Sequence, residues 1–410
     1  MVTTASRWIN HHYAAVLSLG FFSGLPLFLT SSTLQAWFAT EGVSIKHIGF
    51  LSLLGLPYLF KFCWAPLLDS ITPPFLGRRR GWIFITQLGL VITLLFIAGL
   101  HPASHILWMG MVAFCIAFLS ASQDIAINAY QVELLHPEER GLGAAMGVFG
   151  YRMAMLVSGG LALISADHWG WSVTYALMAC IMVAGLMVSW RVPNIIEMTP
   201  PRTFVSAVID PLKEFLSRDR AVLMLGAIML YELGTNFVTV LNSTFFLREL
   251  HFSLTIVGTA YKVVGFMATV VGLFTGGYIL ARIGLYRALI TFGIIQALAS
   301  FLFVILALMG KNYPMMLVAV TGEYLGMGLG TAALFAWLMS LCDHRYTATQ
   351  FALFSALASI CRVFAGPIAG YLVTLLGWPL FYGWGALMSL PGLYLLWLLK
   401  DQFKPLSHQI

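Results

Sequence analysis

Seven ionisable residues lie inside long apolar runs of the sequence. They are Lys61, Asp124, Arg152, Glu232, Lys262, Glu323 and Arg362. A charged side chain at the centre of a bilayer costs roughly 2.5–3.5 kcal/mol on insertion scales, so such residues need partners or a water-filled cavity and usually mark an ion or substrate pathway. The chemistry that they indicate is proton transfer and recognition of a charged solute.

Asp124 and Arg152 form a candidate pair. Each lies eight or nine residues from the same end of its apolar run, so at about 1.5 Å per residue the two side chains should reach similar depth. An arginine favours the ionised form of a neighbouring carboxyl group, so a carboxylate whose arginine comes and goes can bind and release a proton. We predict Asp124 as the proton-coupling group and Arg152 as its partner; the alternative is a permanent ion pair that joins two helices.

For four of the other charged residues, the sequence allows more than one role. Glu232 and Glu323 are candidate second proton sites or acceptors for substrate hydroxyls, although Glu323 could equally neutralise Arg362 or Lys262. Lys61 and Lys262 suit an anionic solute because lysine presents a mobile point charge. The alternative is that both ammonium groups extend toward an interface.

Polar residues surround two of the carboxylates at helical spacing. One series is Ser120, Asp124, Asn128 and Gln131, and the other is Glu232, Asn236, Thr239 and Ser243. Spacing of three or four residues places side chains on one helix face, which favours a lined pathway, although hydrogen bonds between helices would give the same spacing. We predict that Asn128 and Asn236 bind substrate. Tyr58 and Tyr151, beside these positions, could stack on sugar rings or simply pack.

The composition defines what positions these residues. Only 9% of the 410 residues are charged and 60% are hydrophobic, whereas a soluble domain is about 25% charged. This excludes a soluble enzyme, and the scattered basic residues form no patch for nucleic acid. Five cysteines without a CxxC pair, and no nucleotide-loop, zinc-protease or serine-hydrolase motif, predict no metal and no cofactor, with an ion gradient as the energy source.

Twelve apolar runs reach the roughly 20 residues that cross a bilayer. They lie at 13–38, 46–68, 81–100, 105–131, 143–165, 171–190, 221–248, 254–281, 286–309, 313–341, 347–375 and 379–399. The polar interruption 192–220 has apolar residues spaced as in a helix lying on the membrane surface. We predict an all-α integral membrane protein with an amino-terminal six-helix half at 1–191, a linker at 192–220 and a carboxy-terminal six-helix half at 221–410.

The basic residues outside the runs predict the orientation. Three lie on one side: Lys46, Arg248 and Lys311. Fifteen lie on the other: Arg7, Arg78, Arg79, Arg80, Arg140, Arg191, Arg202, Lys213, Arg218, Arg220, Arg282, Arg287, Arg345, Lys400 and Lys404. Because Lys and Arg accumulate in cytoplasmic loops, we predict that both termini are cytoplasmic.

Several strings in the sequence resemble the AmpG muropeptide permease family of the major facilitator superfamily. They include Gly24-Leu25-Pro26-Leu27, Leu34-Gln35-Ala36-Trp37, Phe60-Lys61-Phe62, Trp64-Ala65-Pro66-Leu67-Leu68-Asp69, Thr72-Pro73-Pro74, Ser120-Ala121-Ser122-Gln123-Asp124-Ile125 and Gly150-Tyr151-Arg152. The resemblance implies roles for Gln35 and Gln123 in substrate binding. It also implies conformational gating by Asp69, Arg78, Arg79 and Arg80, and by Arg140 and Arg282 in the related loops. Ala281 stands where the second acid would be.

The resemblance implies the fold and function of a major facilitator protein. Some members of the family carry additional carboxy-terminal helices, whereas we expect twelve helices in this chain. The expected activity is proton symport of N-acetylglucosaminyl-1,6-anhydro-N-acetylmuramyl peptides from the periplasm across the bacterial inner membrane, by a monomer, for cell-wall recycling. In this family the imported peptides also supply the signal that induces β-lactamase. Asn128 stands where members often have an acid, which puts the proton stoichiometry in doubt.

Two alternatives remain open. One is a major facilitator transporter of another bulky solute, such as an acyl-nucleotide like acetyl-coenzyme A, a siderophore or a peptide. The other is a membrane sensor that does not transport. The seven buried charges disfavour the sensor, because it has no need of a proton-titrating cavity.

Overall fold

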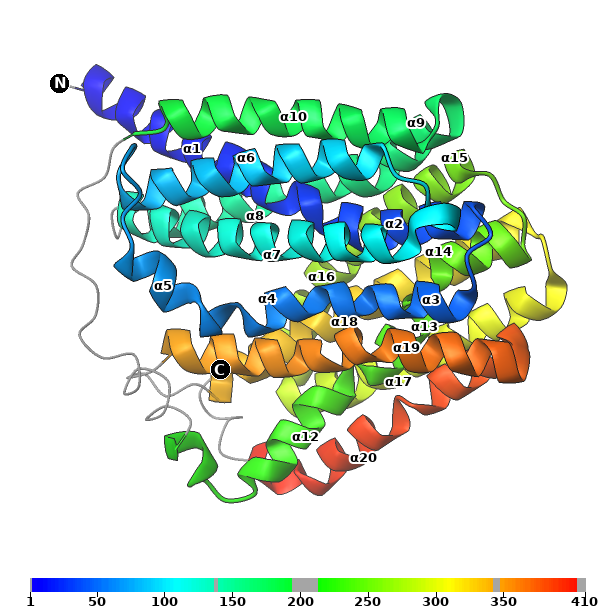
Figure 1. Ribbon diagram of the computed structural model, residues 1–410. Helices are drawn as coiled ribbons and strands as arrows, with labels where there is room; N and C mark the ends of the chain where they lie inside the picture. The colour runs from blue at the N-terminus through cyan, green and yellow to red at the C-terminus, as the bar shows by residue number, and fades with distance from the viewer. Residues whose placement is uncertain (1, 136–138, 194–212, 342–346, 404–410) are drawn as a thin grey trace. The chain divides into compact units, whose positions relative to one another are not determined.

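The computed structural model describes residues 2–135, 139–193, 213–341 and 347–403. All regular secondary structure among these residues is helical (Figure 1). The chain divides into two compact units, one made of 1–43 and 54–202, the other of 44–53 and 203–410. The predicted surface helix of the 192–220 linker lies mostly outside the described residues.

The first unit contains long helices and several short segments. They are α1 (Val2–Thr30), α2 (Ser32–Thr40), α4 (Leu56–Phe60), η2 (Lys61–Cys63), α5 (Ala65–Ser70), α6 (Arg78–Ala98), α7 (Pro102–Leu134), α8 (Arg140–Leu156), η3 (Val157–Leu161), α9 (Ala162–Trp169) and α10 (Trp171–Arg191). Helix α1 packs most extensively on α8, and α6 packs on both α7 and α10. In Figure 1, α10, α6 and α7 run as long ribbons side by side.

The second unit has a similar make-up. It contains α3 (Ile45–Phe50), α12 (Ala221–Tyr231), α13 (Leu233–Thr239), α14 (Asn242–Thr244), η4 (Phe245–Glu249), α15 (Leu254–Ile256), η5 (Val257–Val263), α16 (Val264–Ile283), α17 (Leu285–Met309), α18 (Tyr313–Leu341), α19 (Thr347–Leu387), α20 (Leu390–Leu398) and η6 (Lys400–Phe403); η1 (Leu51–Gly55) crosses the boundary between the units. Helix α18 packs against α16 and α17.

Glycines permit the closest helix contacts in both units. A Cβ atom on Gly150 of α8 would lie 2.1 Å from the Leu17 carbonyl oxygen of α1, and one on Gly328 of α18 would lie 2.3 Å from the Thr269 carbonyl oxygen of α16. Small residues allow backbones to approach in this way within a membrane, where dispersion and not hydrophobicity drives helix association. The Gly326-x-Gly328-x-Gly330 sequence is therefore a helix-packing motif and not a nucleotide loop.

Three of the seven intramembrane charges lie where the helical backbone is irregular. Lys61 begins the 3₁₀ segment η2 within a run that is broken into short helices, and Pro57 and Pro66 in that run have no N–H to donate. Glu232 separates α12 from α13, with φ −96° and ψ 7°. Lys262 lies in η5, a π-helical segment. Irregular backbone at membrane depth is tolerated where it is buried in protein or lines a water-filled cavity.

Ten helices among the described residues are long and apolar enough to cross a membrane. Nine of the predicted runs coincide with candidates to within a few residues, which confirms those predictions. The run at 46–68 is absent from the ten because it is broken, and the last two predicted runs fall within one candidate at Ala356–Leu398. The count of twelve therefore stays a prediction.

Candidate functional site

Asp124 lies on α7 at the meeting point of three elements of the first unit. Its Oδ2 atom forms an ion pair with the Lys61 ammonium of η2, and its Oδ1 atom accepts a hydrogen bond of 2.9 Å from the Ser23 hydroxyl of α1. The Asp124 side chain is 17% exposed and that of Lys61 is 35% exposed. The carboxylate is thus held by a cation that remains partly accessible.

In this structure Asp124 pairs with Lys61 and not with Arg152, the partner that the sequence predicted. Arg152 is exposed on α8 and forms no ion pair with another described residue. Lys61 lies as far from the corresponding end of its predicted run as Asp124 does, so depth alone allows either cation as the partner. The segment that carries Lys61 packs on α7, whereas α8 packs mainly on α1. The two charges proposed for separate tasks, proton coupling and substrate binding, therefore form one pair.

Further polar groups adjoin this pair. The Tyr58 hydroxyl is buried near Ser120, Tyr151 and Asp124. The Tyr58 and Ser120 hydroxyls lie within hydrogen-bonding reach of each other, and neither has a further partner among the described residues. Their remaining hydrogen-bonding capacity suits a polar ligand.

Two hydrogen bonds hold α7 in place at the same level. The Trp64 indole donates to the Ser122 hydroxyl at 3.0 Å, which ties the broken segment to α7. The Gln123 amide donates to the Phe22 carbonyl at 3.1 Å, which ties α7 to α1. Gln123 is fully buried, so this bond gives it a positioning role; its predicted role in substrate binding is untested.

The remaining predicted residues of the first unit are spread over different environments. Gln35 is buried on α2. Asn128 is exposed one turn after Asp124. Ser23 and Trp64 were not predicted; Ser23 lies one residue before the Gly24-Leu25-Pro26-Leu27 string, and Trp64 lies within the matched string that ends at Asp69.

In the second unit, Glu232 lies at the break between α12 and α13. Its Oε1 atom is 3.4 Å from the Thr331 hydroxyl of α18, and Arg362 lies within electrostatic reach. Glu232 is half-buried. Asn236, one turn further, is buried and its amide nitrogen has no hydrogen-bond partner among the described residues. These residues form a second polar cluster, which the spacing of Glu232 and Asn236 predicted.

Glu323 has a different environment from Glu232. It is fully buried on α18, its Oε2 atom accepts a hydrogen bond of 3.0 Å from the Ser300 hydroxyl of α17, and Thr235 of α13 lies within hydrogen-bonding reach of the carboxyl group. The predicted alternative of an ion pair with Arg362 or Lys262 is not seen. A carboxyl group in this position serves to link α17 and α18.

Lys262 is half-buried in η5, with its ammonium group 4.2 Å from the centre of the Tyr261 ring. This distance is typical of a cation–π interaction. The Tyr261 hydroxyl in turn accepts a hydrogen bond of 3.0 Å from Tyr324 of α18. Through Tyr261, the Lys262 ammonium is therefore linked to α18.

The three consecutive arginines at the start of α6 are buried. Arg79 donates to the Glu133 carboxylate of α7 at 2.7 and 2.9 Å, and Arg78 lies 3.8 Å from the same group. Arg80 donates to the Ser189 and Trp190 carbonyls at the end of α10. Glu133 is a functional candidate that the predicted gating set lacked, although it follows Asp124 on the same helix by nine residues.

The other predicted gating residues are less informative. The side chains of Asp69 and Arg140 lie outside the described part of the structure. Arg282 is exposed and contacts Tyr278 on its own helix, with its guanidinium 4.4 Å from the ring centre. Groups of three or more metal-ligating side chains do not occur among the described residues.

Comparison with known proteins identifies the family. The sequence model of the Major Facilitator Superfamily matches residues 16–366 and 223–409. The chain is 46% identical over 385 residues to the anhydromuropeptide permease of Escherichia coli K12, covering 93% of this chain and 78% of that protein. The chain belongs to the AmpG muropeptide permease family. It is thus a multi-pass membrane protein of a transporter family and not an enzyme.

Other relatives and solved structures agree with this assignment. A protein of Rickettsia conorii described as putative transporter AmpG 4 is 32% identical, over 94% of this chain and 96% of its own length. A peptide-bound transporter of the POT family has a TM-score of 0.74 at 12% identity, covering 96% of each chain. A D-xylose–proton symporter has a TM-score of 0.70 at 14% identity, covering 94% of this chain and 96% of its own. These structures support the all-α major facilitator fold.

Proposed function

We propose that this AmpG-family protein imports anhydro-muropeptides together with protons, from the periplasm to the cytoplasm, by alternating access. The relative at 46% identity is described as an anhydromuropeptide permease, which supports the substrate. The observation that carries the coupling is the Asp124 carboxylate, held between Lys61 and Ser23 at an irregular part of the first unit.

The Lys61–Asp124 pair supplies a simple coupling step. An ionised Asp124 retains the Lys61 ammonium, whereas a protonated Asp124 has no charge with which to hold it. The released ammonium, whose side chain is 35% exposed, is then free to bind a carboxylate of the muropeptide. Loss of the proton restores the ion pair and expels the anionic substrate, so proton and substrate move together.

In the second unit we assign the second titrating group to Glu232. It is half-buried at a helix break and lies within reach of Arg362, whereas Glu323 is fully buried between α17 and α18. Asn236, Lys262 and the Tyr58–Tyr151 region then supply hydrogen bonds, a positive charge and aromatic surface for the sugar and peptide parts of the substrate.

We infer from the distribution of the basic residues that both termini lie in the cytoplasm and that the protein is in the bacterial inner membrane. The buried Arg79–Glu133 pair lies near the cytoplasmic ends of α6 and α7 and would brace that side during gating. Imported anhydro-muropeptides would serve cell-wall recycling and the induction of β-lactamase. The protein would work as a monomer, with the proton gradient as its only energy source.

Uptake by proteoliposomes tests this proposal. Labelled anhydro-muropeptide should accumulate when an inward proton gradient is imposed and only equilibrate without it. Asp124→Asn should abolish gradient-driven accumulation while exchange of labelled for unlabelled substrate continues, because exchange needs no net proton movement. Asp219→Asn is a matched control, since the Asp219 side chain is 81% exposed. Proton-driven uptake that persists in Asp124→Asn would exclude Asp124 as the coupling group.

A further inference from the structure

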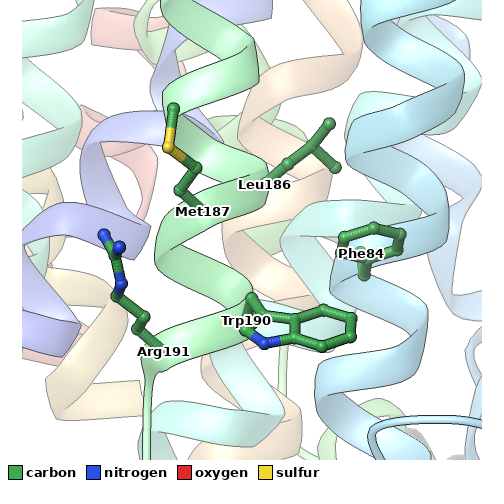
Figure 2. Close-up of a pocket in the computed structure, with 5 residues that line it drawn as sticks. All are labelled: Phe84, Leu186, Met187, Trp190 and Arg191. Carbon is green, nitrogen blue, oxygen red and sulfur yellow. The ribbon is translucent and has the colours of Figure 1, made fainter.

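An open groove of about 250 Å³ lies on the first unit where α6 and α10 run side by side. Phe84, Leu186, Met187, Trp190 and Arg191 line it, and we call it the α6–α10 groove. In Figure 2 the rings of Phe84 and Trp190 lie together, with their centres 6.1 Å apart, while the Arg191 side chain extends back along α10 beside Met187. The groove thus has an apolar floor and a cation at one end.

The apolar surface continues from the groove along both helices. On α10 the exposed large residues are Val173, Leu177, Val183, Met187 and Trp190, and on α6 they are Leu88, Ile92, Leu95 and Phe96. Spacings of three or four residues, as between Val183, Met187 and Trp190 on α10 and between Leu88, Ile92 and Leu95 on α6, place these side chains on one face of each helix. Each helix therefore presents an apolar stripe that runs away from the groove.

Arg80 holds the end of the groove in place, and the Arg191 side chain is exposed beside it. Arg80 reaches from α6 to the Ser189 and Trp190 carbonyls, so the last turn of α10 is held against α6. Arg191 itself is exposed and forms no hydrogen bond or ion pair through its side chain with another residue that the structure describes. Its guanidinium has five N–H donors and suits a phosphate group.

We propose that the α6–α10 groove binds one anionic phospholipid of the cytoplasmic leaflet, with its phosphate on Arg191 and an acyl chain along the apolar stripes. The inference rests on the proposed orientation of the chain and is independent of the proposed substrate and proton coupling. Basic pockets between transmembrane helices on the cytoplasmic side are typical sites for anionic lipid headgroups.

The dimensions fit one leaflet. Half of a hydrocarbon core of about 30 Å is about 15 Å, which corresponds to about ten residues of helix. Counted back from Arg191, this length ends near Ile181, and the exposed Val183, Met187 and Trp190 lie within it. Trp190, 60% exposed beside Arg191, lies where tryptophan is enriched, at the level of the headgroups.

Native mass spectrometry of the intact, detergent-solubilised protein tests the proposal. The protein is titrated with phosphatidylglycerol or phosphatidylcholine of identical acyl chains, and the retained lipid is counted. We expect one phosphatidylglycerol to be retained in preference to phosphatidylcholine. Arg191→Gln should lower the affinity for phosphatidylglycerol about fivefold, the factor that corresponds to about 1 kcal/mol for one basic residue near an anionic surface, and should remove the headgroup preference.

Two further variants complete the test. Arg287→Gln removes the same charge from an exposed position on the second unit and should leave lipid retention unchanged. Met187→Trp, at a position that is 51% exposed, should fill the groove and reduce retention of both lipids. Equal retention of the two lipids by the wild-type chain, undiminished retention in Arg191→Gln, or a dimer that these substitutions disrupt would each overturn the proposal. Uptake of muropeptide is not part of the readout, so failure here leaves the proposed function intact.

Discussion

Replacing Lys61 by methionine tests whether Asp124 pairs with Lys61, as in the structure, or with Arg152, as the sequence predicted. The substitution keeps much of the side-chain length and removes the charge, which leaves Asp124 with the Ser23 hydrogen bond alone. Breaking a fully buried ion pair costs about 3–5 kcal/mol, whereas an exposed pair contributes about 0–1 kcal/mol. Because the Lys61 and Asp124 side chains are 35% and 17% exposed, we expect an intermediate loss of about 2 kcal/mol.

A double-mutant cycle isolates this energy. Lys61→Met, Asp124→Asn and the double variant are unfolded by titration with a denaturing detergent, and the free energy of unfolding is compared with that of the wild type. The double variant has neither charge, so its loss should be smaller than the sum of the single losses, with a coupling energy of about 2 kcal/mol. The parallel cycle with Arg152→Met should give a coupling energy below about 0.5 kcal/mol.

Substrate binding is measured on the same variants. Lys61→Met should weaken substrate binding in the folded fraction, since the ammonium group is also the proposed ligand for a substrate carboxylate. Strong coupling between Arg152 and Asp124, with none between Lys61 and Asp124, would refute the assigned pairing. A large loss of stability with unchanged substrate affinity would instead assign Lys61 to structure alone.

Three further outcomes follow from contacts elsewhere in the fold. Glu323→Ala should lower the free energy of unfolding by about 1 kcal/mol, because the hydrogen bond from Ser300 is lost while the Gln296 carbonyl remains as an acceptor for that hydroxyl. Glu323→Gln retains an acceptor and should leave proton-driven uptake intact; loss of that uptake would return Glu323 to the coupling machinery. Arg79→Ala should cost about 3–5 kcal/mol in detergent unfolding. Within the described part of the chain, Glu133, whose side chain is 7% exposed, would keep an ion pair only with the more distant Arg78. Wild-type stability would show that the Arg79–Glu133 pair is dispensable. Gly150→Ala should sharply lower the melting temperature, because the new methyl group would lie 2.1 Å from a carbonyl oxygen of α1. Gly383→Ala is the control, since Gly383 has open space around it and the substitution should leave the melting temperature unchanged. Equal effects of the two substitutions would contradict the close contact of α1 and α8.

The membrane-spanning layout was largely predictable because it depends on length and composition. Runs such as 313–341 and 171–190 coincide with helices since a bilayer requires about 20 apolar residues and the backbone must satisfy its own hydrogen bonds. Asp124, Lys61 and Glu232 were predictable as candidates for the same reason, because an unpaired charge in lipid is costly.

The contacts of these charges were not predictable from spacing. The pairing of Asp124 with Lys61 depends on which helices are neighbours, because the segment that carries Lys61 packs on α7 whereas α8 packs mainly on α1. Pro57 and Pro66 signal that this run is irregular, but they do not say where Lys61 will point. The break at Glu232 carries no proline or glycine at that residue, so tertiary packing decides it.

The broken run around Lys61 also has a consequence for mutational scanning. Pro57 and Pro66 lie in the first turns of α4 and α5, so this run is divided into short helices. Each helix end leaves C=O or N–H groups without an intrahelical partner. Part of the polarity at this site therefore belongs to the main chain. Substituting every side chain there in turn would leave those groups in place, and a scan that found tolerant positions would underestimate how much of the site is involved in binding.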